Sequence, residues 1–154
     1  MRTIYTRRVA GDCVSRRYEI ICLALKLRML DMTHTRDSLN FFYDVEEADF
    51  DGLVVARSHE APVLLDIGAE WCAPCKVLTP KLEKLVQEYG GKFLLAKVDA
   101  DENMRIAGRH KVRGFPTVIA YSRGKETDRF HSAQPDGFLR RFIDKLIAQH
   151  QSSS

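Results

Sequence analysis

Two cysteines separated by two residues carry the clearest chemical signal in this sequence. Cys72 and Cys75 follow an apolar segment and stand in the stretch Glu70-Trp71-Cys72-Ala73-Pro74-Cys75-Lys76. This spacing, where a strand gives way to a helix, is typical of redox-active dithiols. The nucleophile in disulfide exchange is the thiolate and not the thiol. The pair therefore predicts a site that exchanges electrons with a disulfide.

The position of Cys72 explains how a thiolate could form at neutral pH. If the strand ends near Gly68 and a helix begins near Cys72, free N–H groups and the positive end of the helix dipole point at this sulfur. Both stabilise the anion and lower the pKa of the thiol. Cys75 comes about one turn later, within reach of a mixed disulfide on Cys72. Pro74 fits the first helical turn, where its missing N–H costs nothing.

Composition indicates one globular domain without a basic face. The chain has 154 residues, of which 45% are hydrophobic and 29% charged, which is the range of folded proteins. The net charge is +3, but residues 1–31 alone hold seven Lys and Arg against three acids. The rest of the chain is therefore close to neutral. We expect no nucleic-acid partner on this ground.

The first 37 residues are expected to be an extension outside the domain. Five arginines precede position 18, and the apolar run of residues 20–25 is far shorter than the ~20 residues of a membrane span. We expect no membrane partner and no secretory signal. Two interpretations remain: a mitochondrial presequence, or a miscalled start with Met32 as the true first residue. The second would give a cytoplasmic protein, and the first a mitochondrial matrix protein.

The other cysteines and the histidines do not form a metal-binding pattern. Cys13 and Cys22 have eight residues between them, whereas a four-cysteine zinc site would need a second Cys-X-X-Cys. The histidines also lack the spacing of metal ligands. We therefore expect neither a metal nor a cofactor.

From residue 38 the pattern alternates between strands and helices. Apolar periodicity predicts strands over 39–45, 63–67, 93–98, 118–121 and 127–131, and helices over 46–58, 72–89, 103–110 and from Pro135 onward. Pro80 should kink the second helix, and Gly90-Gly91 should end it. The order predicts an α/β fold, a central mixed sheet with helices on both faces. The domain is expected to span residues 38–150, and residues 151–154 to form a polar tail.

One carboxylate interrupts the most apolar strand. Asp66 lies in the near-continuous apolar run of residues 63–67, which is typical of a strand buried on both faces. Burial raises the pKa of a carboxyl group, so Asp66 could exchange protons near neutrality. Its expected task is to take the proton of Cys75, directly or through water.

Further patterns accompany the dithiol: Pro80 inside the helix, Lys97-Val98-Asp99 at a strand end, and Arg113-Gly114-Phe115-Pro116-Thr117. With these motifs, residues from about 40 to 148 resemble the thioredoxin family. The resemblance implies a thioredoxin fold, with Cys72 as the attacking thiol and Cys75 as the resolving thiol. It also implies that Asp66 is a buried carboxylate and that Lys97 is its neighbour on the adjacent strand.

The resemblance further implies a surface that binds the substrate protein. Pro116 is expected to follow a cis peptide bond and to face the cysteines, where neighbouring backbone groups could pair with an extended peptide. The expected binding residues are Trp71, Ala73, Pro74, Phe115 and Pro116. Three positions depart from the family pattern. Gly68 stands in place of a tryptophan, Ala73 in place of a glycine and Ser132 in place of a glycine.

Two functions follow from this resemblance. The first is a monomeric protein-disulfide reductase that acts on protein disulfides and is itself reduced by a thioredoxin reductase or an equivalent electron donor. The alternative is a thioredoxin-like co-chaperone domain that holds its clients with little turnover. Some motifs, such as Leu78-Thr79-Pro80 and Gln134-Pro135, are similar to the thioredoxin domain of such co-chaperones.

Overall fold

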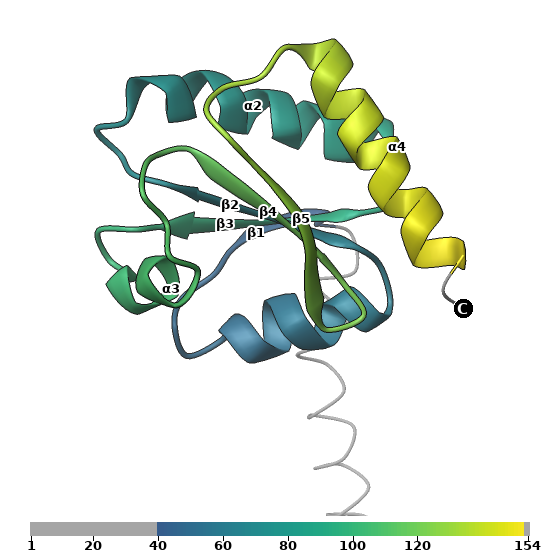
Figure 1. Ribbon diagram of the computed structural model, residues 1–154, viewed down its shortest axis with the longest axis horizontal. Coiled ribbons are helices and arrows are strands. Elements are labelled where there is room, and N and C mark those ends of the chain that lie inside the picture. The colour runs from purple at the N-terminus through teal and green to yellow at the C-terminus, as the bar shows by residue number, and fades with distance from the viewer. Residues whose placement is uncertain (1–39, 153–154) are drawn as a thin grey trace, which may run out of the picture. The chain divides into compact units, whose positions relative to one another are not determined.

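A single five-stranded sheet organises the described part of the chain. The computed structural model describes residues 40–152, and the predicted extension of residues 1–37 lies outside them. The strand order is β1-β3-β2-β4-β5 (Figure 1). β1, β3 and β2 are parallel to one another, whereas β4 is antiparallel to β2 and β5 to β4. The strands span Phe42–Asp44 (β1), Val63–Gly68 (β2), Leu94–Asp99 (β3), Thr117–Ser122 (β4) and Lys125–His131 (β5).

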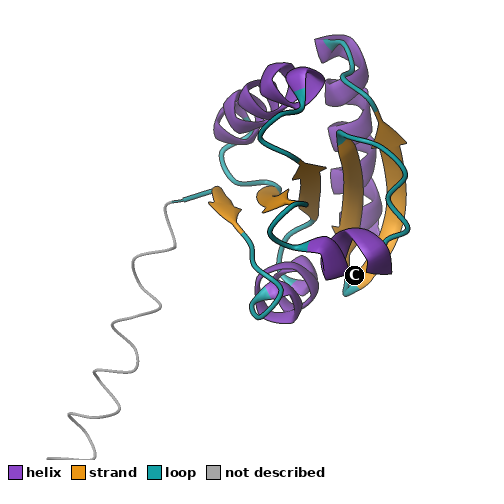
Figure 2. Cartoon of the chain, turned by 90° about the vertical axis from the view of Figure 1, so that its left-hand side faces the viewer, coloured by secondary structure: helices purple, strands orange, loops and turns teal. Residues whose placement is uncertain are grey.

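Helices cover both faces of the sheet (Figures 1 and 2). One face carries α2 (Ala73–Glu88) and α4 (Asp136–Ser152). The other face carries the π-helical η1 (Asp51–Ala56), which leads into the 3₁₀-helical η2 (Arg57–His59), and α3 (Met104–Arg109). The predicted α/β architecture, a mixed sheet between two helical layers, is therefore confirmed.

Side chains of β2 alternate between the two helical layers. Val63, Leu65 and Ile67 belong to the core under η1 and α3, and Leu64 belongs to the core under α2 and α4. Successive residues of a strand point to opposite faces, so Asp66 lies on the α2 face. Each buried aliphatic side chain contributes about 1.5–3 kcal/mol. The free energy gained by burying the apolar side chains of β2 thus offsets the free-energy cost of burying the carboxyl group of Asp66.

α2 has the bounds that the sequence predicted to within one residue. Its stripe of Leu78, Leu82 and Leu85 is buried against the sheet. Pro80 lies inside the helix, which continues on both sides of it. Gly90 follows the helix with a φ of +59°, a left-handed conformation that glycine adopts without steric cost.

Two predicted helices differ from the observed ones. The segment 46–58 was expected to be one α-helix. Instead, the π-helical η1 begins only at Asp51, and the 3₁₀-helical η2 follows it. Ser58 accounts for the tight turn, because its hydroxyl donates to the carbonyl of Val55 (2.7 Å) and accepts the N–H of Gly124 (2.7 Å). At the other end of the chain, α4 continues to Ser152 and so includes half of the predicted tail.

Candidate functional site

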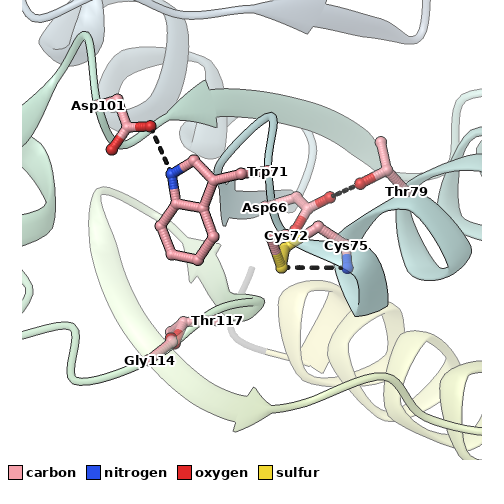
Figure 3. Close-up of a disulfide and its surroundings, with 8 residues drawn as sticks. All are labelled: Asp66, Trp71, Cys72, Cys75, Thr79, Asp101, Gly114 and Thr117. Carbon is pink, nitrogen blue, oxygen red and sulfur yellow. Dashed lines mark hydrogen bonds between the residues drawn. A yellow bond between two sulfur atoms is a disulfide. The ribbon is translucent and has the colours of Figure 1, made fainter.

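The two cysteines lie at the junction between β2 and α2, where they form a disulfide (Figure 3). Their Cα atoms are 5.3 Å apart. Cys72 is the N-cap of α2, and its sulfur accepts the N–H of Cys75 at 3.3 Å. The predicted placement of Cys72 at the start of the helix is confirmed. A sulfur at this position is stabilised as an anion, since it faces unpaired N–H groups and the positive end of the helix dipole.

The disulfide is nearly covered by its neighbours. Cys72 is 4% exposed and Cys75 is 5% exposed, and both pack in a small cluster with Ala69 and the ring of Phe115. Ala73 and Pro74 are the first two residues of α2. Both are exposed, and they lie between the two cysteines in the sequence. The predicted role of Ala73 and Pro74 in substrate binding stays a prediction.

A cis peptide bond joins Phe115 to Pro116 beside the cysteines, as the resemblance implied. Trp71 is 68% exposed, and its ring lies edge-on to that of Phe115 with centroids 5.9 Å apart. The indole N–H of Trp71 donates to Asp101 at 2.7 Å (Figure 3). These contacts hold an exposed aromatic side chain next to the disulfide, which is suited to contact with another protein.

Behind the disulfide lies the buried carboxyl group of Asp66, which is 3% exposed. The hydroxyl of Thr79 donates to one of its oxygens at 2.7 Å, and the other oxygen has no hydrogen-bond partner among the described residues. Burial raises the pKa of Asp66 from 3.8 to about 6 and the charge of Glu83 adds to the rise, while the Thr79 hydrogen bond and the charge of Lys97 oppose it. The predicted burial and the upward pKa shift are both confirmed.

Lys97 lies where the sequence predicted, directly opposite Asp66 in the pairing of β2 with β3. Its ammonium group, however, makes ion pairs with Glu83 at 3.0 Å and with Asp44 at 3.3 Å. Lys97 therefore acts on Asp66 through its charge, and the direct partner of that carboxyl is Thr79.

Sequence reasoning missed Thr79 and Glu83, although a helical signal was present. Cys75, Thr79 and Glu83 follow one another at intervals of four residues on α2, so they lie on one face of the helix. That face meets Asp66 and Lys97. Placing Asp66 on the α2 side of the sheet would have been enough to predict that Thr79 and Glu83 lie near it.

Two hollows flank the disulfide. The inner hollow has a volume of about 450 Å³, and the residues that line it include Asp66, Gly68, Cys75, Thr79, Glu83 and Lys97. A Cβ atom on Gly68 would lie 3.2 Å from the sulfur of Cys75. A side chain at residue 68 would therefore crowd the sulfur of Cys75, which glycine leaves uncrowded.

The outer hollow, called the basic pocket below, has a volume of about 520 Å³ and lies on the cis-proline side. The residues that line it include Lys111, Arg113, Phe115, Pro116, Arg129 and His131. Phe115 borders both this pocket and the disulfide. The basic pocket therefore adjoins the disulfide through the ring of Phe115.

No cluster of three or more His, Cys, Asp or Glu side chains within residues 40–152 is arranged to hold a metal ion. The expectation that the protein has no resident metal or cofactor stays a prediction. The chemistry that the site does support is exchange between a dithiol and a disulfide, with a nearby group able to take a proton. The fold and the site thus define a dithiol–disulfide exchange protein.

Comparison with known proteins gives the family. Residues 42–145 match the family model described as Thioredoxin. The chain is 40% identical over 113 residues to "Thioredoxin, mitochondrial" of Mus musculus, an alignment that covers 73% of this chain and 67% of the relative. It is 33% identical over 116 residues to "Thioredoxin M-type, chloroplastic" of Pisum sativum, and this alignment covers 75% of this chain and 66% of the relative. It is 38% identical over 103 residues to "Thioredoxin" of Staphylococcus aureus, and this alignment covers 67% of this chain and 95% of the relative.

The chain belongs to the thioredoxin family. Together with the bonded Cys72–Cys75 pair, this membership makes it a thiol-disulfide oxidoreductase of the protein-disulfide reductase type. The co-chaperone alternative is not favoured, because the relatives reported above are thioredoxins.

Proposed function

We propose that Cys72 and Cys75 reduce a client disulfide in two steps. The Cys72 thiolate attacks one sulfur of the client, which forms a Cys72–client disulfide and releases the other client sulfur as a thiolate that takes up a proton. The Cys75 thiolate then attacks the Cys72 sulfur, so that the second client thiol leaves and the Cys72–Cys75 disulfide forms. In total, two electrons and two protons pass to the client. The observation that carries this proposal is the Cys72 sulfur at the helix N-cap, already bonded to Cys75.

Asp66 is the group that we assign to the proton of Cys75. The second step needs a Cys75 thiolate, and a carboxyl group whose pKa is about 6 can accept a proton near neutral pH. The inner hollow is lined by both Asp66 and Cys75, so water in it can link the two. Thr79 positions the carboxyl group, and Lys97 stabilises its charged form.

The client is proposed to bind as an extended strand beside the cis-proline. Phe115 makes no backbone hydrogen bond within residues 40–152, whereas the carbonyl of Pro116 accepts the N–H of Ser132 at 2.9 Å. The N–H and C=O of Phe115 are therefore available to pair with a client backbone. Trp71, Ala73 and Pro74 complete the contact surface on the other side of the sulfurs.

Reduction of insulin by the purified protein, with dithiothreitol as the electron source, tests the function. We expect rapid turnover by the unaltered chain and by the Cys13→Ser and Cys22→Ser controls, and none above background for Cys72→Ser. Binding of reduced or oxidised insulin without turnover would instead support a client-holding domain.

The remaining partners and the compartment are also proposals. We propose a monomer that receives electrons from a thioredoxin reductase and has no membrane partner; within residues 40–152 no helix has the length and apolar character to cross a bilayer. The arginines of residues 1–31 and the mitochondrial names of the mouse and rat relatives support import into mitochondria. Sequencing the N-terminus of the mature protein tests this. A cytoplasmic protein that begins at Met32 would contradict import.

A further inference from the structure

The basic pocket joins residues from two segments that are distant in the sequence. Lys111 and Arg113 come from the loop after α3, and Arg129 and His131 come from the end of β5. Pairing of Thr117 with His131 in the β4–β5 ladder brings the segments together. The pocket therefore concentrates three permanent positive charges and an imidazole immediately beside Phe115.

Two of these charges have no acidic partner within the described part of the chain. Arg129 makes an ion pair with Glu126 and donates to the carbonyl of His110 at 2.9 Å. By contrast, Lys111 and Arg113 lie on the surface without an ion pair to any acid within residues 40–152. Charges of like sign that remain unpaired around one hollow favour an anionic ligand.

His131 adds a polar atom in a fixed orientation. The hydroxyl of Thr117 donates its single hydrogen to the carbonyl of Gly114 at 2.7 Å, so its oxygen can only accept from the Nδ1 atom of His131 at 2.9 Å. Nδ1 therefore carries a hydrogen, and the ring is held with Nε2 as its other polar atom. In this tautomer Nε2 carries no hydrogen, so the ring forms part of the pocket wall without donating to a carboxylate.

The backbone of the pocket is held in a conformation that glycine would adopt more easily. Lys111 has a φ of +53° and Ser132 a φ of +65°, and only one other non-glycine residue within residues 40–152, Arg123, has a positive φ. Lys111 occupies the left-handed position after α3, where its N–H bonds to Gly108 (3.0 Å) and that of Val112 bonds to Ala107 (3.0 Å). The left-handed backbone at residue 111 thus places an exposed lysine at the pocket, and this lysine makes no ion pair within residues 40–152.

An acid lies on the other side of the Trp71 ring from the basic pocket. Asp101 binds the indole of Trp71 (Figure 3), and Glu70 and Glu102 are exposed nearby in the sequence. Figure 3 draws Asp101 and Gly114 on opposite sides of the Trp71 ring. The charge across the entry to Cys72 is therefore asymmetric, so that one orientation of a charged peptide is favoured over the other.

We propose that the basic pocket binds an Asp or Glu side chain of the client, and that the protein therefore prefers disulfides flanked by acidic residues on the cis-proline side. This inference rests on the proposed function, since it assumes that clients lie along Phe115. Lys111 and Arg113 supply the attraction, and His131 forms part of the pocket wall. The preference acts on binding of the client and leaves the two exchange steps unchanged.

Three matched peptides test the proposal. Each contains the same intramolecular disulfide, and the residues that flank one cysteine are Glu, Gln or Lys. We expect the unaltered protein at low salt to reduce the Glu peptide with a kcat/KM about threefold to tenfold above that of the Lys peptide, through KM, because two exposed ion pairs contribute on this scale. The double variant Lys111→Glu, Arg113→Glu should reverse the order. Lys92→Glu is the control, since Lys92 is exposed and precedes β3 at the opposite end of the sheet, and it should keep the preference.

Equal kcat/KM values for the three peptides would overturn the inference while leaving the reductase function intact. Failure to reduce even the Gln peptide would overturn the reductase function instead. In that case, the affinities of Glu and Lys peptides that carry serine in place of cysteine would test the proposed pocket without any disulfide exchange. Trp71 is the sole tryptophan, so its fluorescence reports occupancy beside Phe115. Tighter binding of the Glu peptide would support the pocket, and equal binding would contradict it.

Discussion

The two hollows beside the disulfide are similar in volume but differ in the charges of the side chains that line them. The inner hollow contains a buried carboxyl group balanced by Thr79 and by the charge of Lys97, and its ion pairs lie within the protein. In the basic pocket, two exposed cations have no acidic partner within residues 40–152. One hollow borders Cys75 and the other borders Phe115. The proposed sites of proton transfer and of client selection are therefore separated in space.

This separation has a kinetic consequence. Changes in the inner hollow should alter release of the client from Cys72, because that step needs the Cys75 thiolate. Changes in the basic pocket should alter KM and the choice among clients, because that pocket meets the client before any bond forms. A substitution that shifts both properties together would break the distinction.

The largest effect is expected for Asp66→Asn, which removes the titrating group and keeps its shape. We expect the second exchange step to slow by at least about tenfold near pH 7, since general bases commonly contribute more than this. The first step, measured by formation of the Cys72–client disulfide, should be unchanged. Stopped-flow mixing with a fluorescent peptide disulfide resolves the two phases, and equal slowing of both would refute the assignment of Asp66 to Cys75.

The same variant has a pH-dependent effect on stability. The pKa of Asp66 is about 6 in the folded protein against an ordinary value of 3.8, so the folded state holds this proton more tightly than the unfolded state. Stability therefore falls as pH rises from about 4 to about 6. The Asn side chain does not ionise, so Asp66→Asn does not lose stability in this pH range. The variant should raise the free energy of unfolding of the oxidised protein by about 2–3 kcal/mol at pH 8. Urea melts at pH 4 and pH 8 measure it; an equal effect at both would contradict the burial argument.

A smaller loss is expected for Thr79→Val. Without the hydroxyl, the carboxylate of Asp66 loses the donor that stabilises its charge, so its pKa should rise further above 6. Stability should fall by about 1–2 kcal/mol at pH 8 and by less at pH 5. Thr79→Ser is the matched control, because it keeps the donor. A Ser variant as unstable as the Val variant would show that Thr79 acts through packing and not through its hydrogen bond.

The smallest effect, and the one that sharpens the basic pocket, is expected for Lys111→Gly. Glycine relieves the left-handed backbone at residue 111, so the variant should be more stable by roughly 0.5–1 kcal/mol and should lose part of the preference for acidic peptides. Lys111→Ala is its partner, since it removes the charge but keeps the strain. It should lose the same preference without the gain in stability. A Gly variant that keeps the full preference would remove Lys111 from the pocket.

The dithiol half of the site was predictable because its signals are local. Cys72, Cys75 and Pro74 lie within one helical turn, and Asp66 is conspicuous as the acid in an apolar strand. The fold followed from the alternation of strands and helices. The cis bond before Pro116 came only from the family resemblance, since an X-Pro pair by itself favours the trans isomer.

The basic pocket was not predictable, because it depends on tertiary structure. Lys111 and His131 belong to different elements, and only the β4–β5 pairing places them around one hollow. The left-handed backbone of Lys111 also leaves no mark in the sequence, where glycine or asparagine would be expected. In the same way, the 3₁₀ turn at Ser58 depends on a contact with Gly124. Long-range contacts thus account for most of what was missed.

The most direct test of the central claim is the rate at which iodoacetamide modifies each active-site cysteine of the reduced protein. A chain carrying Cys13→Ser and Cys22→Ser confines the reaction to Cys72 and Cys75, and peptide mapping reads each one separately. The helix N-cap predicts that Cys72 reacts first and, at pH 7, about tenfold faster than an ordinary peptide thiol, while Cys75 remains protected. Reaction of Cys75 first, or reaction of Cys72 at the ordinary rate, would contradict the account.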